Sequence, residues 1–262
     1  MTTRDYSTIS PSARAVLAMR SLSPELPFVR EAAELVLGKD ALAAEHARLQ
    51  ALVGWQMRLW HFVERYQSLD RLLAASGLTN VVELAAGLSL RSLALAQKQA
   101  VTYLDTDLPE MIETKRGLVE QLAVSPLVGD VKLRAMNALA DGELATAVDE
   151  LPPGPVAILN EGLLMYLDDA EKRRVAANIH GVLAKRGGVW ITADIYLTTP
   201  ANMPPIGRDD RLNHFLTTHR VEENKFASFA AAEQLFTDAG FAVTKREGAS
   251  PIRQTWMLEL AP

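Results

Sequence analysis

The sequence predicts an α/β fold in which a largely parallel sheet is covered by helices and preceded by a helical N-terminal region. Three patterns in the 262 residues lead to this prediction. Residues before about Gly77 show helical spacing without a strand pattern, short apolar runs alternate with amphipathic segments from Asn80 onward, and the last two apolar runs lie close enough to pair. A composition of 48% hydrophobic and 23% charged residues is typical of a globular chain with a substantial core.

The N-terminal region is expected to form three or four helices. Its apolar residues recur at helical spacing, as in Ala32, Leu35 and Val36. We therefore expect a helical lid region over residues 1–77 and one integrated core domain over residues 78–262.

The core is expected to contain seven strands with helices between them. Buried strands are predicted at Val81–Ala85, Ala100–Leu104, Val131–Ala135, Val156–Leu159 and Val189–Ala193, and a closing antiparallel hairpin at Phe241–Glu247 and Arg253–Leu260. Helical patterns cover residues 89–98, 108–123, 139–149, 168–185 and 227–239. The stretch between Asp194 and the last of these helices is expected to be irregular, because prolines recur in it.

Composition argues against several classes of protein. A formal net charge of −5 does not suggest the concentrated basic face that nucleic-acid binding requires, and the absence of cysteine excludes disulfides and thiolate chemistry. No apolar run approaches the roughly 18 residues of a membrane-spanning helix, and the N-terminus lacks the pattern of a secretory signal. We expect a cytoplasmic protein with no nucleic-acid or membrane partner. Metal binding is not expected, because no carboxylate and histidine cluster has ligand spacing.

The first segment with possible chemistry runs from Val81 to Arg91. A buried strand ends in the small-residue turn Ala85-Ala86-Gly87 and opens directly into a helix. Ligands of open α/β sheets bind at the carboxyl ends of strands, and small residues let the backbone approach them closely. The segment is either such a loop or an ordinary tight turn, since it carries one glycine where nucleotide loops usually carry three.

The second segment places Asp105 and Asp107 at the end of the next strand. An acidic residue about 20 positions after a cofactor loop is where nucleotide-binding units grip a ribose. The two aspartates have the same parity, so both could point to one side of the chain. Capping of the following helix, whose first turn Pro109 presets, is the alternative role for Asp107.

The third segment is Asn160-Glu-Gly-Leu-Leu-Met-Tyr-Leu167, which follows an apolar strand. A carboxylate in so apolar a neighbourhood must be paired or hydrogen-bonded. Glu161 is therefore expected to meet either the cationic part of a cofactor or a buried arginine. The leucines and Met165 are expected to be core residues.

Together these segments resemble the leucine carboxyl methyltransferase-like superfamily, including its bacterial branch of polyketide and small-molecule O-methyltransferases. The resemblance rests on Glu83-Leu-Ala-Ala-Gly-Leu-Ser with Arg91, on Asp105-Thr-Asp-Leu-Pro-Glu-Met-Ile, on Asn160-Glu-Gly-Leu-Leu-Met-Tyr-Leu, and on Arg65-Tyr66 followed by Leu69-Asp70. It implies a Rossmann-like class I methyltransferase sheet and S-adenosyl-L-methionine as the cofactor. Five parallel strands with a terminal antiparallel pair suit that sheet better than a pure dinucleotide-binding one.

The resemblance also implies roles for individual residues. Arg65 would pair with the carboxylate of the cofactor's methionine end, and Glu161 would face its amino group, with Asn160 beside it. Glu83, Ala85 and Gly87 would form the floor under the cofactor. Asp107, or alternatively Asp105, would hold the ribose. Asn137 and Ala138 would meet the adenine edge, although the family often has an acidic residue there, and Arg91 would brace the loop.

The acceptor is expected to be a small molecule with a hydroxyl or carboxylate group, methylated by in-line displacement. No catalytic residue is fixed by the sequence; Tyr166, His61 and His214 are candidates by type. Tyr6, Met19 and Arg20 are further candidates for the acceptor cavity, and Arg208, Arg211 and Arg220 for attracting an anionic acceptor.

Three other functions stay open at this point. One is methyl esterification of a protein carboxyl terminus, which uses the same chemistry. Another is an NAD(P)-dependent oxidoreductase, although the loop from Ala85 to Ser89 lacks the glycine triad of that class. The third is a binding protein that retains the cofactor pocket without turnover.

Overall fold

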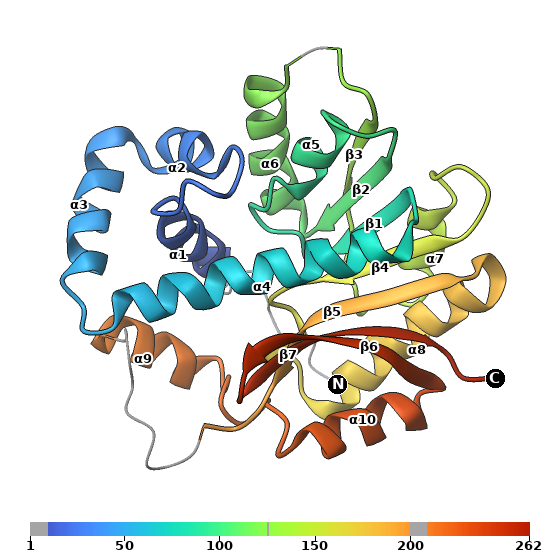
Figure 1. Cartoon of the computed structure of the whole chain (residues 1–262). Helices are drawn as coiled ribbons and strands as arrows, with labels where there is room; N and C mark the ends of the chain where they lie inside the picture. The colour runs from blue at the N-terminus through green and yellow to red at the C-terminus, as the bar shows by residue number, and fades with distance from the viewer. Residues whose placement is uncertain (1–9, 125, 200–208) are drawn as a thin grey trace.

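The computed structural model describes residues 10–124, 126–199 and 209–262 of the chain. These residues form one seven-stranded sheet with helices on both faces and a group of helices at one side (Figure 1). The strands are β1 (Asn80–Leu84), β2 (Thr102–Asp107), β3 (Asp130–Ala135), β4 (Val156–Asn160), β5 (Gly188–Tyr196), β6 (Phe241–Ser250) and β7 (Arg253–Leu260).

The strand order is β3-β2-β1-β4-β5-β7-β6. Strands β1 to β5 are parallel, and β7 lies antiparallel between β5 and β6. The predicted sheet with its closing antiparallel hairpin is therefore confirmed. The chain leaves β1 in one direction for β2 and β3 and returns beside β1 as β4, so the carboxyl ends of β1 and β4 flank the crevice where open α/β sheets bind ligands.

Ten helices and one short 3-10 turn are found in the described residues. They are α1 (Ser10–Arg20), α2 (Val29–Leu37), α3 (Lys39–Gln50), α4 (Trp55–Ser76), α5 (Arg91–Ala96), α6 (Pro109–Leu122), α7 (Glu143–Val148), η2 (Leu164–Tyr166), α8 (Asp169–Arg186), α9 (Asp210–Thr218) and α10 (Phe229–Asp238). The four helices before β1 and the five predicted between or after the parallel strands are all present.

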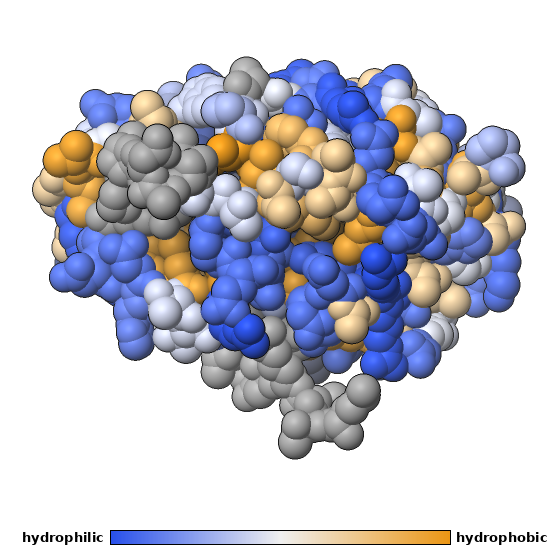
Figure 2. Space-filling model, turned by 90° about the horizontal axis from the view of Figure 1, so that it is seen from below, coloured by the Kyte–Doolittle hydropathy of each residue, from blue (hydrophilic) through white to orange (hydrophobic). Residues whose placement is uncertain are grey.

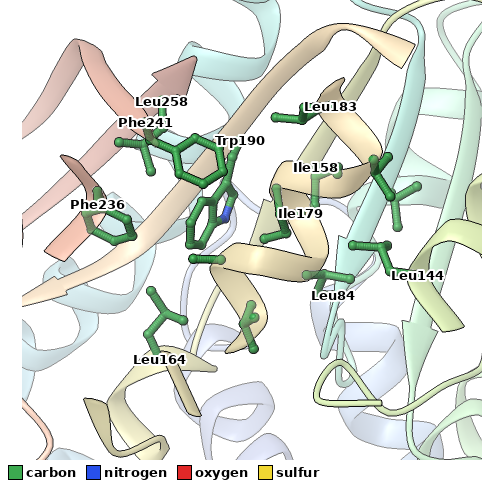
Figure 3. Packing of buried hydrophobic residues seen from close by; sticks show 14 of the residues in the cluster. Leu84, Leu144, Ile158, Leu164, Ile179, Leu183, Trp190, Phe236, Phe241 and Leu258 are labelled. Atoms are coloured by element: carbon green, nitrogen blue, oxygen red, sulfur yellow. The ribbon is translucent and has the colours of Figure 1, made fainter. Parts of the chain in front are cut away.

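Both faces of the sheet are buried, as expected for parallel strands covered by helices. On one face, Trp190 of β5 packs edge-on against Phe236 of α10 at a ring-centroid distance of 5.1 Å, and Ile179 of α8 belongs to the same cluster (Figure 3). On the other face, the second half of α4 supplies Leu69, Leu72 and Leu73 to a cluster with residues of β1, β2, β4, β5 and β7. Alternate strand residues face these two layers.

The N-terminal helices form their own apolar cluster beside the sheet. Residues of α1, α2 and α3 pack with Val63 and Tyr66 from the middle of α4 and with Met111 and Leu118 of α6. Helix α4 therefore belongs to two layers, because its following turns pack on the sheet. This shared helix fixes α1 to α3 next to the carboxyl ends of the strands.

Helix α9 corrects the expectation of an irregular segment after the fifth strand. Asp209 caps its first turn by accepting a hydrogen bond from the Leu212 amide at 2.9 Å. Leu212, Phe215 and Leu216 follow at the spacing of one helical face. Strand β5 also extends to Tyr196, further than predicted.

On the face seen from below, hydrophobic side chains gather in several patches separated by hydrophilic ones (Figure 2). Among the residues that the structure describes, no helix is long and apolar enough to cross a bilayer.

Candidate functional site

A cavity of about 320 Å³ opens where β1, β2, β3 and β4 end. Of the residues predicted to bind the cofactor or to act in catalysis, those that line it are Arg65, Glu83, Ala85, Gly87, Asp107, Asn137, Ala138, Glu161 and Tyr166, and of the acceptor candidates Arg20 and Arg211 line it. We call two groups of lining residues the polar half and the apolar half; the lining also includes the charged residues Glu45, Arg48, Arg58, Asp209 and Arg211. The polar half contains Arg20, Arg65, Glu83, Gly87, Asp107 and Glu161; the apolar half contains Val16, Phe62, Tyr166, Leu212, Phe215 and Leu216.

The turn after β1 is shaped by left-handed backbone and held from β2. Ala85 has φ 50° and Gly87 φ 53°, a region that favours glycine. The Ala86 amide donates to the Thr106 carbonyl at 3.0 Å, and the Gly87 amide donates to Asp107 Oδ2 at 2.7 Å. The turn is therefore fixed by the strand beside it.

Asp107 lies at the end of β2 and lines the polar half. Besides the Gly87 amide, its carboxylate accepts a hydrogen bond from the Leu108 amide to Oδ1 at 2.7 Å. Burial raises the pKa of Asp107, while these two backbone hydrogen bonds oppose the rise. Each carboxylate oxygen keeps a lone pair, so the side chain is oriented and can still accept from a ligand hydroxyl.

Glu83 forms the base of the polar half. It accepts hydrogen bonds from Arg91 Nη1 at 2.5 Å and from the Tyr103 hydroxyl at 2.6 Å. Arg91 does not line the cavity; its Nε bonds Asp70 Oδ1 at 2.5 Å and its Nη2 bonds Glu161 Oε2 at 3.0 Å. A single guanidinium thus ties together β1, α4 and the loop after β4, which is the bracing role expected of Arg91.

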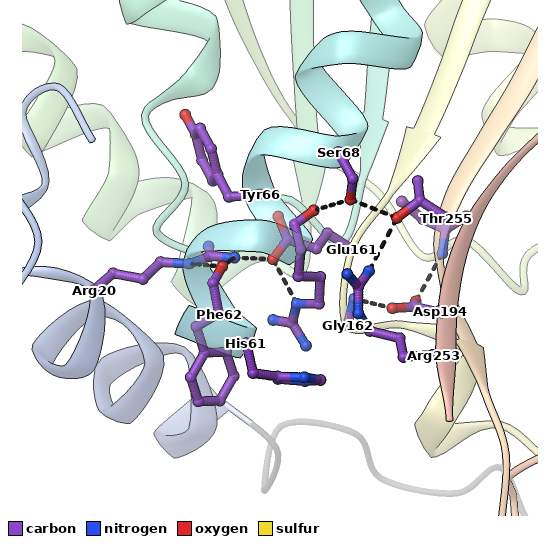
Figure 4. A network of polar contacts seen from close by, with 12 residues as sticks. Arg20, His61, Phe62, Tyr66, Ser68, Glu161, Gly162, Asp194, Arg253 and Thr255 are labelled. Carbon is purple, nitrogen blue, oxygen red and sulfur yellow. Dashed lines mark hydrogen bonds and ion pairs between the residues drawn. The ribbon is translucent and has the colours of Figure 1, made fainter. Parts of the chain in front are cut away.

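Glu161 is the centre of the polar half. It pairs with Arg20 at the end of α1 (Figure 4). It also pairs with Arg65 of α4 at 2.7 Å and with Arg91 of α5, so its three arginine partners come from distant parts of the chain. Burial alone would raise the pKa of Glu161, but the three guanidiniums hold it well below its usual range. The carboxylate is therefore ionised and the site can present both signs of charge.

Arg65 and Arg20 are the two arginines of the polar half that line the cavity. Arg65 donates through Nε to Glu161 and through Nη1 to the Tyr196 hydroxyl at 3.2 Å. Arg20 also donates to the Phe62 carbonyl at 3.2 Å. Arg20 was a candidate for the acceptor cavity and does line it. Its contact with Glu161 follows from no local pattern, since 141 positions separate the two residues.

The loop that carries Glu161 is held by Asp194, a residue for which the sequence suggested no role. Asp194 accepts hydrogen bonds from the Gly162, Leu163 and Leu164 amides at 2.7, 2.7 and 3.0 Å. Asn160 in turn donates to Asp194 Oδ2 at 2.8 Å. Asn160 is fully buried and outside the cavity lining, so its role is to support the loop.

Asp105, the alternative to Asp107, also lies outside the lining. It is fully buried and pairs with Lys115 Nζ at 2.9 Å and with the Ser92 hydroxyl. Two residues of strand place it about 6–7 Å deeper in the sheet than Asp107. Asp105 and Asp107 therefore share the parity expected of them, but only Asp107 reaches the cavity.

Asn137 and Ala138 follow β3 and line the cavity. The Asn137 amide donates to Glu143 Oε2 at 2.8 Å, and the Asn137 side chain accepts from the Leu139 amide at 3.0 Å. Glu143 thus brings a carboxylate to the end of the third strand, although it lies six positions further along the chain than Asn137.

The three candidates for proton transfer are placed differently. Tyr166 lines the apolar half, where burial raises its pKa and its ring meets Phe215 edge-on at 6.3 Å. His61 hydrogen-bonds the Tyr196 hydroxyl at 2.9 Å beside the cavity, and burial together with Arg65 and Arg253 lowers its pKa to about 3. His214 is exposed on α9 and does not line the cavity. Tyr6 and Arg208 lie outside the described residues.

Of the other acceptor candidates, Arg211 lines the cavity and Arg220 pairs with Glu223 on the surface. Met19 is buried in the N-terminal cluster rather than at the cavity. Among the described residues, no three histidine, aspartate or glutamate side chains are grouped to hold a metal ion.

The fold and the site together define a Rossmann-like class I methyltransferase sheet. Residues 25–180 match the leucine carboxyl methyltransferase family, so the chain belongs to this family. A "Putative S-adenosyl-L-methionine-dependent methyltransferase" of Mycobacterium marinum is 28% identical over 160 residues, which are 59% of this chain and 48% of the relative. A protein of the same description from Mycobacterium tuberculosis is 26% identical over 170 residues, 63% of this chain and 49% of the relative. The chain thus spans about half the length of the curated relatives it matches.

Solved structures agree on the fold. A possible exported protein of Bordetella parapertussis superposes with a TM-score of 0.56 at 20% identity, covering 99% of this chain and 98% of its own. Magnesium protoporphyrin IX methyltransferase of Synechocystis PCC 6803, with bound S-adenosylhomocysteine (SAH), gives a TM-score of 0.50 at 12% identity. The superposition covers 76% of this chain and 85% of that methyltransferase. At such low identity these likenesses concern the fold alone.

Proposed function

We propose that the chain binds S-adenosyl-L-methionine in the polar half of the cavity and transfers its methyl group to a carboxylate oxygen of a small acceptor. The observation that carries this proposal is the grouping of Arg65 and Arg20 with Glu161 in the same cavity lining as Asp107 and the Gly87 turn. Guanidinium groups suit the cofactor's carboxylate, and a carboxylate suits its ammonium group.

The residues present fit this cofactor. Of the five N–H groups of Arg65, its bonds to Glu161 and Tyr196 use two, so the same side chain can hold a carboxylate without releasing Glu161. Asp107, already oriented by two amides, would accept hydrogen bonds from ribose hydroxyls. The Asn137-Ala138 segment would meet the adenine.

The cofactor supplies an electrophilic methyl group on a sulfonium, and the chain supplies position and exclusion of water. Glu161, Arg65 and Asp107 would fix the two ends of the donor. The N-terminal helices cover the cavity from above the strand ends. An acceptor oxygen held in the apolar half would then attack the methyl carbon as the carbon–sulfur bond breaks.

A carboxylate is the acceptor that the lining supports best. The described residues of the lining include no histidine, and His61 beside it is a weak base. Glu161 is a weak base because the arginines lower its pKa, and Tyr166 stays protonated because burial raises its pKa. A hydroxyl acceptor would benefit from a general base, whereas a carboxylate is already ionised at neutral pH.

Calorimetric titration with S-adenosylmethionine, its demethylated product and NAD tests the cofactor. We expect both sulfur compounds to bind, and Arg65→Ala to weaken them by about tenfold or more through loss of a charged hydrogen bond. Arg71→Ala, an exposed arginine on the same helix, is the control. Binding of NAD alone would instead support an oxidoreductase.

The bond formed tests the acceptor. Methyl esters release methanol in alkali, whereas methyl ethers do not. Radiolabelled methyl groups transferred by the protein should therefore become volatile after base treatment. Base-stable label would contradict the carboxylate assignment. Label on a peptide with a free C-terminus but not on small acids would favour a protein carboxyl terminus.

A further inference from the structure

Helix α9 has an apolar face that the rest of the described chain covers only in part. Leu212, Phe215 and Leu216 lie on that face and line the cavity, yet α9 contains no fully buried residue. An amphipathic helix normally packs its apolar stripe against a core. Here the stripe faces the cavity, so the surface it would bury is that of a ligand.

The other residues of the apolar half have the same character. Phe62 of α4, Val16 of α1 and Tyr166 line this half. The Tyr166 and Phe215 rings are nearly perpendicular at 6.3 Å, and Phe215 lies 4.4 Å from the His219 ring, so the aromatic side chains of α9 and η2 are already arranged around one another. A cavity of about 320 Å³ lies in the range of small-molecule sites.

Ion pairs at the mouth of the cavity join α3 to the start of α9. Arg48 of α3 binds Glu45 through Nε and Nη2 at 2.8 and 2.6 Å and also pairs with Asp209, the residue that caps α9. Arg48 is matched by these two carboxylates, but Arg58 and Arg211 also line the cavity, so its charged lining does not itself exclude a second negative charge on the acceptor.

We infer that α9 is the element that selects the acceptor: a carboxylic acid whose body is apolar and packs on Leu212, Phe215 and Leu216. This rests on the proposed function and adds the substrate class to it. The carboxylate of such an acid would face the polar half, where the methyl donor is proposed to lie, and the body would cover the apolar stripe.

Binding of simple acids to the complex with S-adenosylhomocysteine tests the inference. We expect 3-phenylpropionate to bind at least about tenfold more tightly than acetate or succinate, because its ring can be buried. Phe215→Ala should weaken 3-phenylpropionate by about tenfold and Leu212→Ala by several-fold. Thr217→Ala, exposed on the same helix and outside the lining, is the matched control. All three variants should keep wild-type affinity for S-adenosylhomocysteine.

The outcomes separate this inference from the proposed function. Any of three results would overturn the role of α9 while leaving the cofactor site intact. Succinate could bind as tightly as 3-phenylpropionate, 3-phenylpropionate could fail to bind, or Phe215→Ala could keep the wild-type affinity for 3-phenylpropionate. If S-adenosylhomocysteine itself does not bind, the proposed function fails. Titrating 3-phenylpropionate into the cofactor-free wild type and Phe215→Ala proteins then tests the apolar wall alone.

Discussion

The two halves of the cavity are built in opposite ways. In the polar half, Glu161 and Glu83 are almost fully buried and each is bound by a buried arginine. In the apolar half, α9 contributes Leu212 and Phe215 without burying any residue completely. One half is a closed network of charge pairs, and the other is a partly exposed apolar wall.

This difference indicates how the two halves would respond to change. Charges held in a low dielectric depend on every partner, because removing one leaves another buried and unpaired. An apolar wall has no such dependence, and its residues can change size at modest cost. We therefore expect stability to reside in the polar half and selectivity in the apolar half.

Removal of Arg91 should give the largest effect. Arg91→Ala leaves Glu83 and Asp70 without their guanidinium, and buried pairs broken on one side typically cost about 3–5 kcal/mol. Urea unfolding followed by circular dichroism measures this loss. Arg173→Ala, which breaks an exposed pair with Asp238 at 3.3 Å, should change the free energy of unfolding by less than about 1 kcal/mol.

Substitution in the other half completes this comparison. Leu212→Ala should cost much less than Arg91→Ala, because the side chain is only half-buried. A Leu212→Ala variant as unstable as Arg91→Ala would show that α9 is part of the folding core and would remove the contrast between the halves.

The polar half could be predicted from the sequence because its residues follow strands. Gly87, Asp107 and Glu161 each stand at the carboxyl end of a recognisable apolar run, and parallel strands bring those ends together. Local pattern could not distinguish residues that line the cavity from those that support it. Asn160 and Asp105 have the same strand-end position but point into hydrogen bonds within the protein.

The apolar half was largely missed. Asp209 before Leu212 and Phe215 is a helix-start pattern, but the prolines that precede it favoured a prediction of irregular structure. The contact of Arg20 with Glu161 depends on how α1 packs against α4, and no short-range pattern encodes such packing.

The stability of the protein at acid pH tests His61, whose ring bonds the same Tyr196 hydroxyl as Arg65 of the polar half. Its pKa is about 3 in the folded protein against 6.5 for an ordinary histidine, because of burial and the neighbouring Arg65 and Arg253. Between these values the unfolded chain binds a proton at His61 that the folded protein does not bind, and this lowers the free energy of unfolding. The stability that His61 contributes is therefore fully present above about pH 6.5 and is lost as the pH falls towards 3.

His61→Gln should remove that contribution. The free energy of unfolding of wild type minus that of His61→Gln should decrease as the pH is lowered through this window, measured by urea unfolding at several pH values. Taking the difference cancels the opposing effect of buried carboxyl groups such as Asp105. The rate of methyl transfer plotted against pH should have the same shape in wild type and His61→Gln between pH 5 and 8. An inflection that is present in wild type and absent from His61→Gln would restore His61 as the general base.

The smallest expected effect concerns Asp209, which has two separable roles at the edge of the apolar half. Its Oδ1 caps α9 and its Oδ2 pairs with Arg48. Asparagine caps a helix about as well as aspartate, so Asp209→Asn removes only the ion pair. Both partners are partly exposed, so we expect a loss of less than about 1 kcal/mol that diminishes with added salt. Asp209→Ala should lose about 1 kcal/mol more through the cap. Cofactor affinity should be unchanged in both variants, and a loss of it would mean that the rim of the apolar half and the polar half are one coupled unit.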